Sequence, residues 1–83
     1  MPRYFLHLRC AHLAIHDTCG VKCSGPAEAV DAAVVMALNR MSESRECRRW
    51  AGWSVQVEAE TGEHVATVPF TLAWRMRLSR NLR

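Results

Sequence analysis

Apolar and polar side chains alternate along residues 3–9, which is the pattern of a β-strand with one buried face. Tyr4, Leu6 and Leu8 occupy the apolar side of this segment. Residues 12–16 alternate again, with Leu13 and Ile15 on the apolar side. Because only a short connection separates the two segments, we expect them to pair as a β-hairpin.

A turn and a helix follow this hairpin. Asp17 and Gly20 are turn residues, since Asp bonds nearby backbone groups and Gly accepts a positive φ. Pro26 suits the first position of a helix, and Glu28 places a negative charge in the first turn. Apolar residues then recur at helical spacing: Val30, Ala33, Val34, Ala37, Leu38 and Met41. This spacing predicts an amphipathic helix that ends near Cys47.

Two further strands are predicted in the second half of the chain. Residues 53–59 alternate clearly, and residues 60–63 contain Gly62 at the position of a hairpin turn. Residues 64–70 then pair back, and Pro69 indicates a sheet edge or a strand end because it has no N–H to donate. The fold class is therefore α+β in the order β-β-α-β-β, a four-stranded antiparallel sheet with one amphipathic helix on one face.

The predicted core takes its members from all of these segments. It contains Tyr4, Leu6, Leu8, Leu13, Ile15, Val30, Val34, Leu38, Trp53, Val55 and Val57.

Residues 71–83 form a basic tail beyond a single predicted domain of residues 1–70. Leu72, Trp74 and Met76 alternate with polar residues, as in an extension of the last strand. Leu72 and Met76 also have the i,i+4 spacing of a short helix. The pattern leaves both structures open.

Composition and size place the chain among ordinary globular proteins, with 49% hydrophobic and 23% charged residues. A chain of 83 residues has room for one core and buries only about 60–65% of its unfolded surface. Its stability would gain from a partner subunit. Neither a membrane-spanning stretch nor a signal-peptide core is apparent, so we expect a cytoplasmic protein whose cysteines are thiols.

The positive charge is concentrated at the C-terminus. The formal net charge is +3, and the tail holds four of the 11 basic residues and no acid: Arg75, Arg77, Arg80 and Arg83. Residues 1–70 then hold 11 − 4 = 7 basic and 8 acidic residues, a net charge of −1. An anionic partner would therefore meet the tail.

Several ordered motifs resemble one known family. They are the opening Met-Pro-Arg-Tyr-Phe-Leu-His-Leu, the turn from Asp17 to Gly20, the alanine-rich helix after Glu28, and Val-Pro-Phe at residues 68–70. Together residues 1–70 resemble a family of short bacterial proteins, described as a domain of unknown function, whose members begin Met-Pro-Arg-Tyr-Phe-Phe. The resemblance implies the same small α+β fold, but it implies no activity, cofactor or catalytic residue.

The chain departs from this family in two turns. Residues 9–12 replace the usual Asp-Gly pair of the first hairpin, and Thr18 and Cys19 replace the acidic pair before Gly20. Both changes exchange acids for cysteine or histidine, which raises the question of a metal site.

One cluster has the residue types of a zinc site: His12, His16, Cys19 and Cys23. Its spacing is unfavourable, because two residues four apart on a strand lie about 13 Å from one another. The alternative is two surface histidines, one turn cysteine and one buried cysteine that acts as a small hydrophobe. We therefore assign no metal and no other cofactor.

A thiol enzyme is a further alternative, since Cys23 precedes a helix and His16 is the nearest candidate base. No phosphate loop, paired-carboxylate motif or catalytic triad accompanies it, so we assign no catalytic residue and do not expect an enzyme.

Two binding hypotheses remain. The tail arginines with Trp74 could bind nucleic acid or an anionic surface, although four charges are a weak footprint. The uncovered sheet face and the sheet edges could bind a second copy or a small protein partner. We favour this non-enzymatic interaction or self-association domain over the nucleic-acid alternative.

Overall fold

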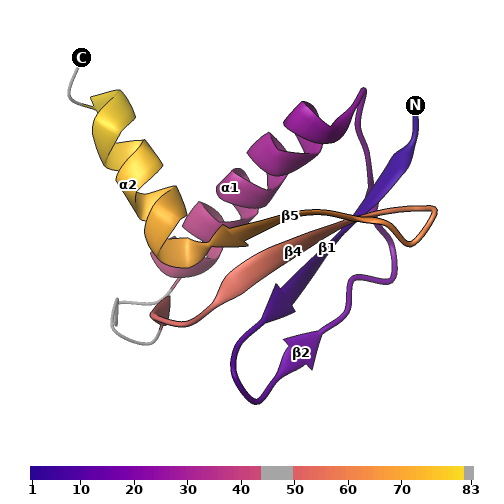
Figure 1. Ribbon diagram of the computed structural model, residues 1–83. Coiled ribbons are helices and arrows are strands. Elements are labelled where there is room, and N and C mark those ends of the chain that lie inside the picture. The colour runs from indigo at the N-terminus through magenta and orange to yellow at the C-terminus, as the bar shows by residue number, and fades with distance from the viewer. Residues whose placement is uncertain (44–49, 82–83) are drawn as a thin grey trace.

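The computed structural model describes the backbone of residues 1–43 and 50–81, and the side chains of residues 1–43 and 50–76. The chain is an α+β protein, as the sequence pattern predicts (Figure 1). Its elements are β1 (Arg3–Arg9), β2 (Ala14–Ile15), β3 (Val21–Lys22), α1 (Pro26–Ser42), β4 (Ser54–Ala59), β5 (His64–Pro69) and α2 (Phe70–Asn81).

The strands form one antiparallel sheet in the order β2-β1-β4-β5, and β3 also pairs with β1. β1 and β4 are the central pair, in which Leu6 lies opposite Val57 and Leu8 opposite Val55. Both predicted hairpins are present, and Gly62 has the expected positive φ of 90° in the second.

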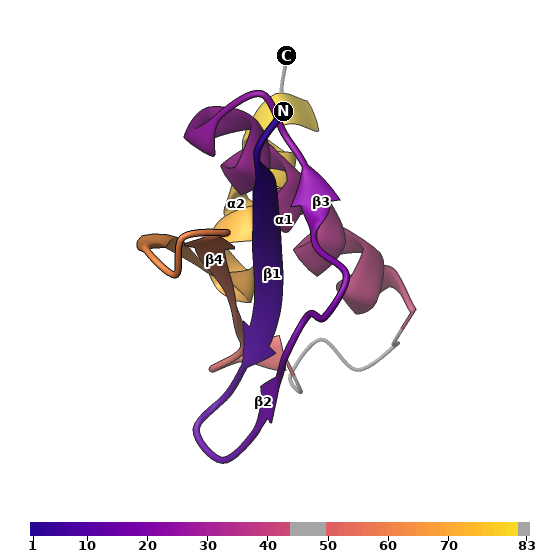
Figure 2. The same cartoon turned by 90° about the vertical axis from the view of Figure 1, so that its right-hand side faces the viewer.

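The arrangement of four strands and one helix is wrong in detail, because the sheet has five strands and the described residues form two helices. The additional strand, β3, has only two residues, too few for alternation to be recognised. It continues the edge that β2 begins, so the two short strands follow one another along the same side of β1 (Figure 2).

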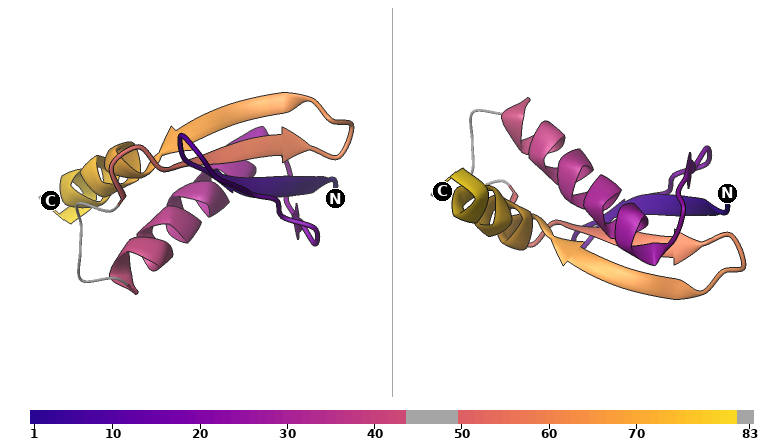
Figure 3. Two further views of the ribbon diagram at one scale, coloured as in Figure 1. Left: turned by 90° about the horizontal axis from the view of Figure 1, so that it is seen from below. Right: turned by 90° about the horizontal axis from the view of Figure 1, so that it is seen from above.

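Both helices pack on the same face of the sheet. α1 lies across β4 and β5, and α2 leaves the end of β5 and packs against α1 (Figure 3). Ala29, Ala33 and Ala37 of α1 are fully buried, and side chains this small let the helix axis approach the sheet closely. The core between the layers includes Val55 and Val57, both without exposed surface.

Residues 70–81 form the helix α2 rather than an extension of β5, and the start of α2 belongs to the core. Phe70 and Ala73 have no exposed surface, and Trp50 stacks on Phe70 with ring centroids 5.2 Å apart. Pro69 ends β5, and the N–H of Phe70 donates to the carbonyl of Trp53 at 3.0 Å. This bond links the β5–α2 junction to the residue that precedes β4.

Two predicted core residues are exposed. Leu13 lies in the loop between β1 and β2, and Ile15 faces the helix side of the sheet where α1 does not reach. The prediction was right about the face of Ile15, which pairs with buried Leu8, and wrong about its burial. Three other predicted members are only half-buried against the core: Val30, Leu38 and Trp53.

α1 begins at Pro26, as predicted, and ends at Ser42. The predicted end near Cys47 lies outside the described residues. Neither helix of the described chain has the length and apolar character needed to cross a membrane.

Candidate functional site

The edge formed by β2 and β3 is interrupted by a turn. Leu8 pairs with Ile15 and Tyr4 with Val21, so the three residues between them on β1 face five residues of the edge, two more than a regular ladder allows. These extra residues bulge out around Asp17, which the sequence marked as a turn residue.

The Asp17 carboxylate replaces the missing strand partner. Its Oδ2 accepts the N–H of Leu6 at 3.1 Å, and its Oδ1 accepts the N–H groups of Cys19 and Gly20 at 3.0 Å. The N–H of Asp17 donates to Nδ1 of His7 at 3.0 Å. The N–H of Leu6, in the middle of β1, is thereby satisfied without a strand beside it.

The pKa of Asp17 reflects this environment. Partial burial acts to raise the pKa, but the hydrogen bonds from Gly20, Leu6 and Cys19 and the charge of nearby His7 outweigh it. The pKa therefore lies below the usual aspartate value, because the charged form receives three N–H donors.

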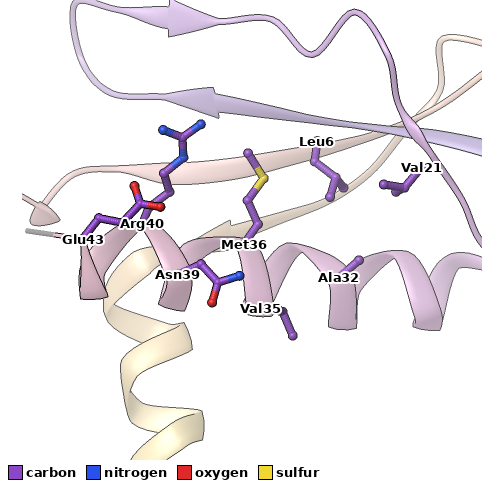
Figure 4. A pocket seen from close by; sticks show the side chains of 8 residues that line it. All are labelled: Leu6, Val21, Ala32, Val35, Met36, Asn39, Arg40 and Glu43. Carbon is purple, nitrogen blue, oxygen red and sulfur yellow. The ribbon is translucent and has the colours of Figure 1, made fainter.

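A groove lies between α1 and this interrupted edge; we call it the edge groove. Its first part, a hollow of about 470 Å³, is lined by Leu6, Val21, Ala32, Val35, Met36, Asn39, Arg40 and Glu43 (Figure 4). A second hollow of about 240 Å³ shares Leu6, Met36 and Arg40 with the first and extends to Leu8 and Ile15. The two hollows therefore adjoin.

The lining of the edge groove is mainly apolar and partly exposed. Ile15 and Val35 are each 53% exposed and Val21 is 37% exposed. Met36 points from α1 toward the strands, whereas Val35 lies on the side of the helix away from them (Figure 4). The polar groups of the first hollow are Asn39, Arg40 and Glu43, from the last turns of α1, and the second hollow adds His16, Asp17 and Thr18 beside Arg40. This composition suits apolar contact better than catalysis.

The predicted zinc ligands are not gathered in one place. His12 and Cys19 are exposed in separate loops, whereas Cys23 is buried where the chain enters α1. His16 lies edge-on to His7, with ring centroids 5.1 Å apart. Among the residues whose structure is described, no group of three His, Cys, Asp or Glu side chains could hold a metal ion.

Cys23 has the environment of a packing residue. Burial raises the pKa of its thiol, and the charge of Glu28 raises it further. A nucleophilic cysteine needs the opposite shift. Glu28 itself accepts hydrogen bonds from the N–H and the hydroxyl of Ser24, which lower the pKa of its carboxyl and hold the start of α1.

The predicted anion-binding residues lie on α2, away from the edge groove. Trp74 and Arg75 are exposed there. Arg77 and Arg80 belong to the same helix, but their side chains lie outside the described part, as does all of Arg83. The structure therefore places only Arg75 of the four arginine side chains.

Sequence reasoning missed the edge groove. The signal was present in the run Val34-Val35-Met36, because three consecutive apolar residues cannot all face one side of a helix. Val34 is buried and Val35 is exposed. Val21, whose strand was not predicted, supplies the opposite wall.

Comparison with known proteins gives one match. The sequence model of a family described as Domain of unknown function (DUF6894) matches residues 3–71 of the 83-residue chain. No curated protein and no solved structure matches the chain significantly.

Proposed function

This chain belongs to the family described as Domain of unknown function (DUF6894), and we propose that it self-associates through the edge groove, all of which lies within the matched residues 3–71. The family resemblance inferred from the sequence is thereby confirmed. The description names no activity, so the proposal rests on the structure.

The observation that carries the proposal is the exposure of Ile15, Val21 and Val35 around one groove. Single exposed aliphatic residues are common on protein surfaces, but a contiguous apolar patch is typical of an interaction site. Leu6 and Met36 continue this patch inward to the core. A partner that fills the groove would therefore extend the hydrophobic core.

A second copy of the chain is the occupant that the charges favour. The first hollow presents Arg40 and Glu43, one charge of each sign, and the Asp17 carboxylate in the second hollow already accepts three N–H groups of its own chain. Two such surfaces can meet about a twofold axis without net repulsion, and Arg40 of one copy can approach Glu43 of the other. The small size of the chain adds a reason, since a second subunit supplies burial that 83 residues lack.

The test is the oligomeric state of two matched variants. Val35→Glu places a charge in the groove, whereas Leu13→Glu places one on a comparably exposed aliphatic residue outside it. We expect sedimentation equilibrium to give a dimer for the unaltered chain and for Leu13→Glu. Val35→Glu should weaken the dimer about tenfold or more, since about 1.4 kcal/mol suffices for that factor.

Two results would contradict self-association. One is an unaltered chain that stays monomeric up to about 1 mM, a concentration at which even a weak dimer with a dissociation constant in that range is populated. The other is equal weakening by Leu13→Glu and Val35→Glu, which would place the interface elsewhere. Circular dichroism of both variants checks that they remain folded.

A further inference from the structure

No helix or strand of residues 1–43 and 50–81 covers the sheet face opposite both helices, and this face, which we call the open face, differs in chemistry from the edge groove. β4 contributes Ser54, Gln56 and Glu58 to it, all half-buried. Thr67 of β5 donates its hydroxyl to the side-chain oxygen of Gln56 at 3.0 Å. An apolar partner would have to bury these groups without hydrogen bonds, which is unfavourable. The occupant should be polar.

The row along β1 is the second feature of the open face. Arg3, Phe5, His7 and Arg9 are the four outward residues of this strand, because Tyr4, Leu6 and Leu8 face the helices. The rings of Phe5 and His7 are nearly parallel, with an interplanar angle of 5° and centroids 6.2 Å apart. Arg3 and Arg9 are exposed at the two ends. Two aromatic rings thus lie between two cations.

His7 is held firmly in this row. Its Nδ1 accepts the N–H of Asp17 at 3.0 Å, and its Nε2 lies 3.7 Å from the carboxylate of Glu58. Arg3 is oriented as well, since its guanidinium donates to the carbonyl of Cys19. A platform that is positioned before binding loses less conformational entropy when it binds.

A hollow of about 390 Å³ adjoins the row, and its lining includes His7, Arg9, Gln56, Glu58 and His64. This volume falls within the range of about 300–1,000 Å³ that small-molecule sites occupy. Carboxylate, amide and imidazole groups match the hydrogen-bonding edges of a nucleobase, and a glutamate can accept from an exocyclic amino group.

We infer that the open face binds a single-stranded nucleic acid, with bases stacked on Phe5 and His7 and phosphates at Arg3 and Arg9. Aromatic rings beside basic side chains are the arrangement by which sheets bind unpaired bases. A duplex does not fit, because its bases are already stacked and paired. Only two cations contact phosphate, so binding depends weakly on salt, with a slope of log affinity against log salt of about −1.4.

The test is fluorescence anisotropy with a labelled single-stranded oligonucleotide of about ten mixed nucleotides. Phe5→Leu keeps an apolar side chain and removes the ring; we expect affinity to fall about fivefold or more. Phe5→Tyr keeps the ring and should bind within about twofold of the unaltered chain. Arg9→Ala should reduce the salt slope by about 0.7.

Arg75→Ala is the matched control, because it removes an exposed arginine from α2, outside both the open face and the edge groove. It should leave both affinity and salt slope unchanged. Equal loss in Arg75→Ala and Arg9→Ala would overturn the inference, as would equal competition by a duplex of the same sequence. Loss in Arg75→Ala but not in Phe5→Leu would assign binding to α2 and also overturn it.

Discussion

α1 has one flank toward β4, β5 and α2, the closed flank, and another toward β2 and β3, the open flank. Both carry apolar side chains, but those of the closed flank are buried and those of the open flank are exposed. Toward β4, β5 and α2, the side chains of Val55, Val57 and Phe70 have no exposed surface. Toward β2 and β3, Ile15 and Val35 remain more than half exposed. The closed flank is covered because β5 continues into α2, which packs against α1. The open flank ends in two short strands interrupted by the Asp17 turn.

This difference shows that the face a side chain occupies and the burial of that side chain are separate properties, although an alternating sequence pattern is used to predict both. Alternation determines which face of a sheet a side chain occupies, since successive residues point to opposite sides. Burial also requires a second element above that face. Ile15 lies on the core-facing side of the sheet but is not covered by a second element. An exposed apolar residue on a core-facing side therefore marks a place where a partner can complete the fold.

The closed flank is tested most strongly at Phe70. Phe70→Ala removes a fully buried ring that stacks on Trp50, and we expect a loss of about 3–5 kcal/mol in the free energy of unfolding. Urea denaturation measures it, with Phe70→Leu as the milder change if the alanine variant is unfolded. Leu72→Ala, on an exposed residue of the same helix, should change stability by no more than about 0.5 kcal/mol. Similar losses for Phe70→Ala and Leu72→Ala would show that α2 is not part of the core.

The open flank depends on Gly20, which has a φ of +74° in the Asp17 turn. A Cβ atom there would lie 2.8 Å from Cγ of Arg3 and 3.0 Å from the carbonyl oxygen of Tyr4. We expect Gly20→Ala to cost about 2–4 kcal/mol, from backbone strain and overpacking together. Gly62→Ala is the matched control, because Gly62 has a φ of +90° and no atom within 4 Å of the added Cβ. Gly62→Ala should lose only the stability that backbone strain accounts for, about 1–2 kcal/mol. Equal losses for the two variants would show that close packing around Gly20 does not stabilise the turn.

Asp17 gives the smallest of these effects and the one that depends on pH. Asp17→Asn weakens the hydrogen bonds to Leu6, Cys19 and Gly20, and should cost about 1–2 kcal/mol at pH 7. Because the folded pKa is lowered, the contribution is complete above the unfolded value of about 3.9 and is lost as pH falls through the folded pKa. Urea denaturation between neutral pH and pH of about 3 should therefore show the two proteins converging in acid. A difference that stays constant over this range would mean that the carboxylate charge does not hold the turn.

The proposed dimer would remove the difference between the flanks, since a second copy would cover Ile15, Val21 and Val35. The first hollow of the edge groove shares no lining residue with the hollow of the open face, whereas the second hollow shares Leu8 and His16 with it. The residues chosen for the tests, Val35 and Phe5, are not among the shared ones. The two proposals can therefore fail independently.

Local pattern was enough for most elements of the fold. The sequence predicted both hairpins, the start of α1 at Pro26, the turn at Asp17 and six core residues: Tyr4, Leu6, Leu8, Val34, Val55 and Val57. Each of these depends on neighbours a few residues apart, which is the range over which alternation, helical spacing and turn chemistry operate. The family resemblance noted in the sequence is confirmed by the match over residues 3–71.

The sequence by itself thus determined the α+β class, the order of the main strands and α1 along the chain, and the buried faces of β1 and β4. The tertiary structure decided that residues 70–81 fold as a helix, since Phe70 and Ala73 can be buried only against elements distant in sequence. It also decided that Ile15 and Val35 stay exposed, because α1 lies toward β4 and β5 and leaves the β2–β3 edge uncovered. The physical reason is that burial is a property of two surfaces in contact, and a local pattern describes only one of them.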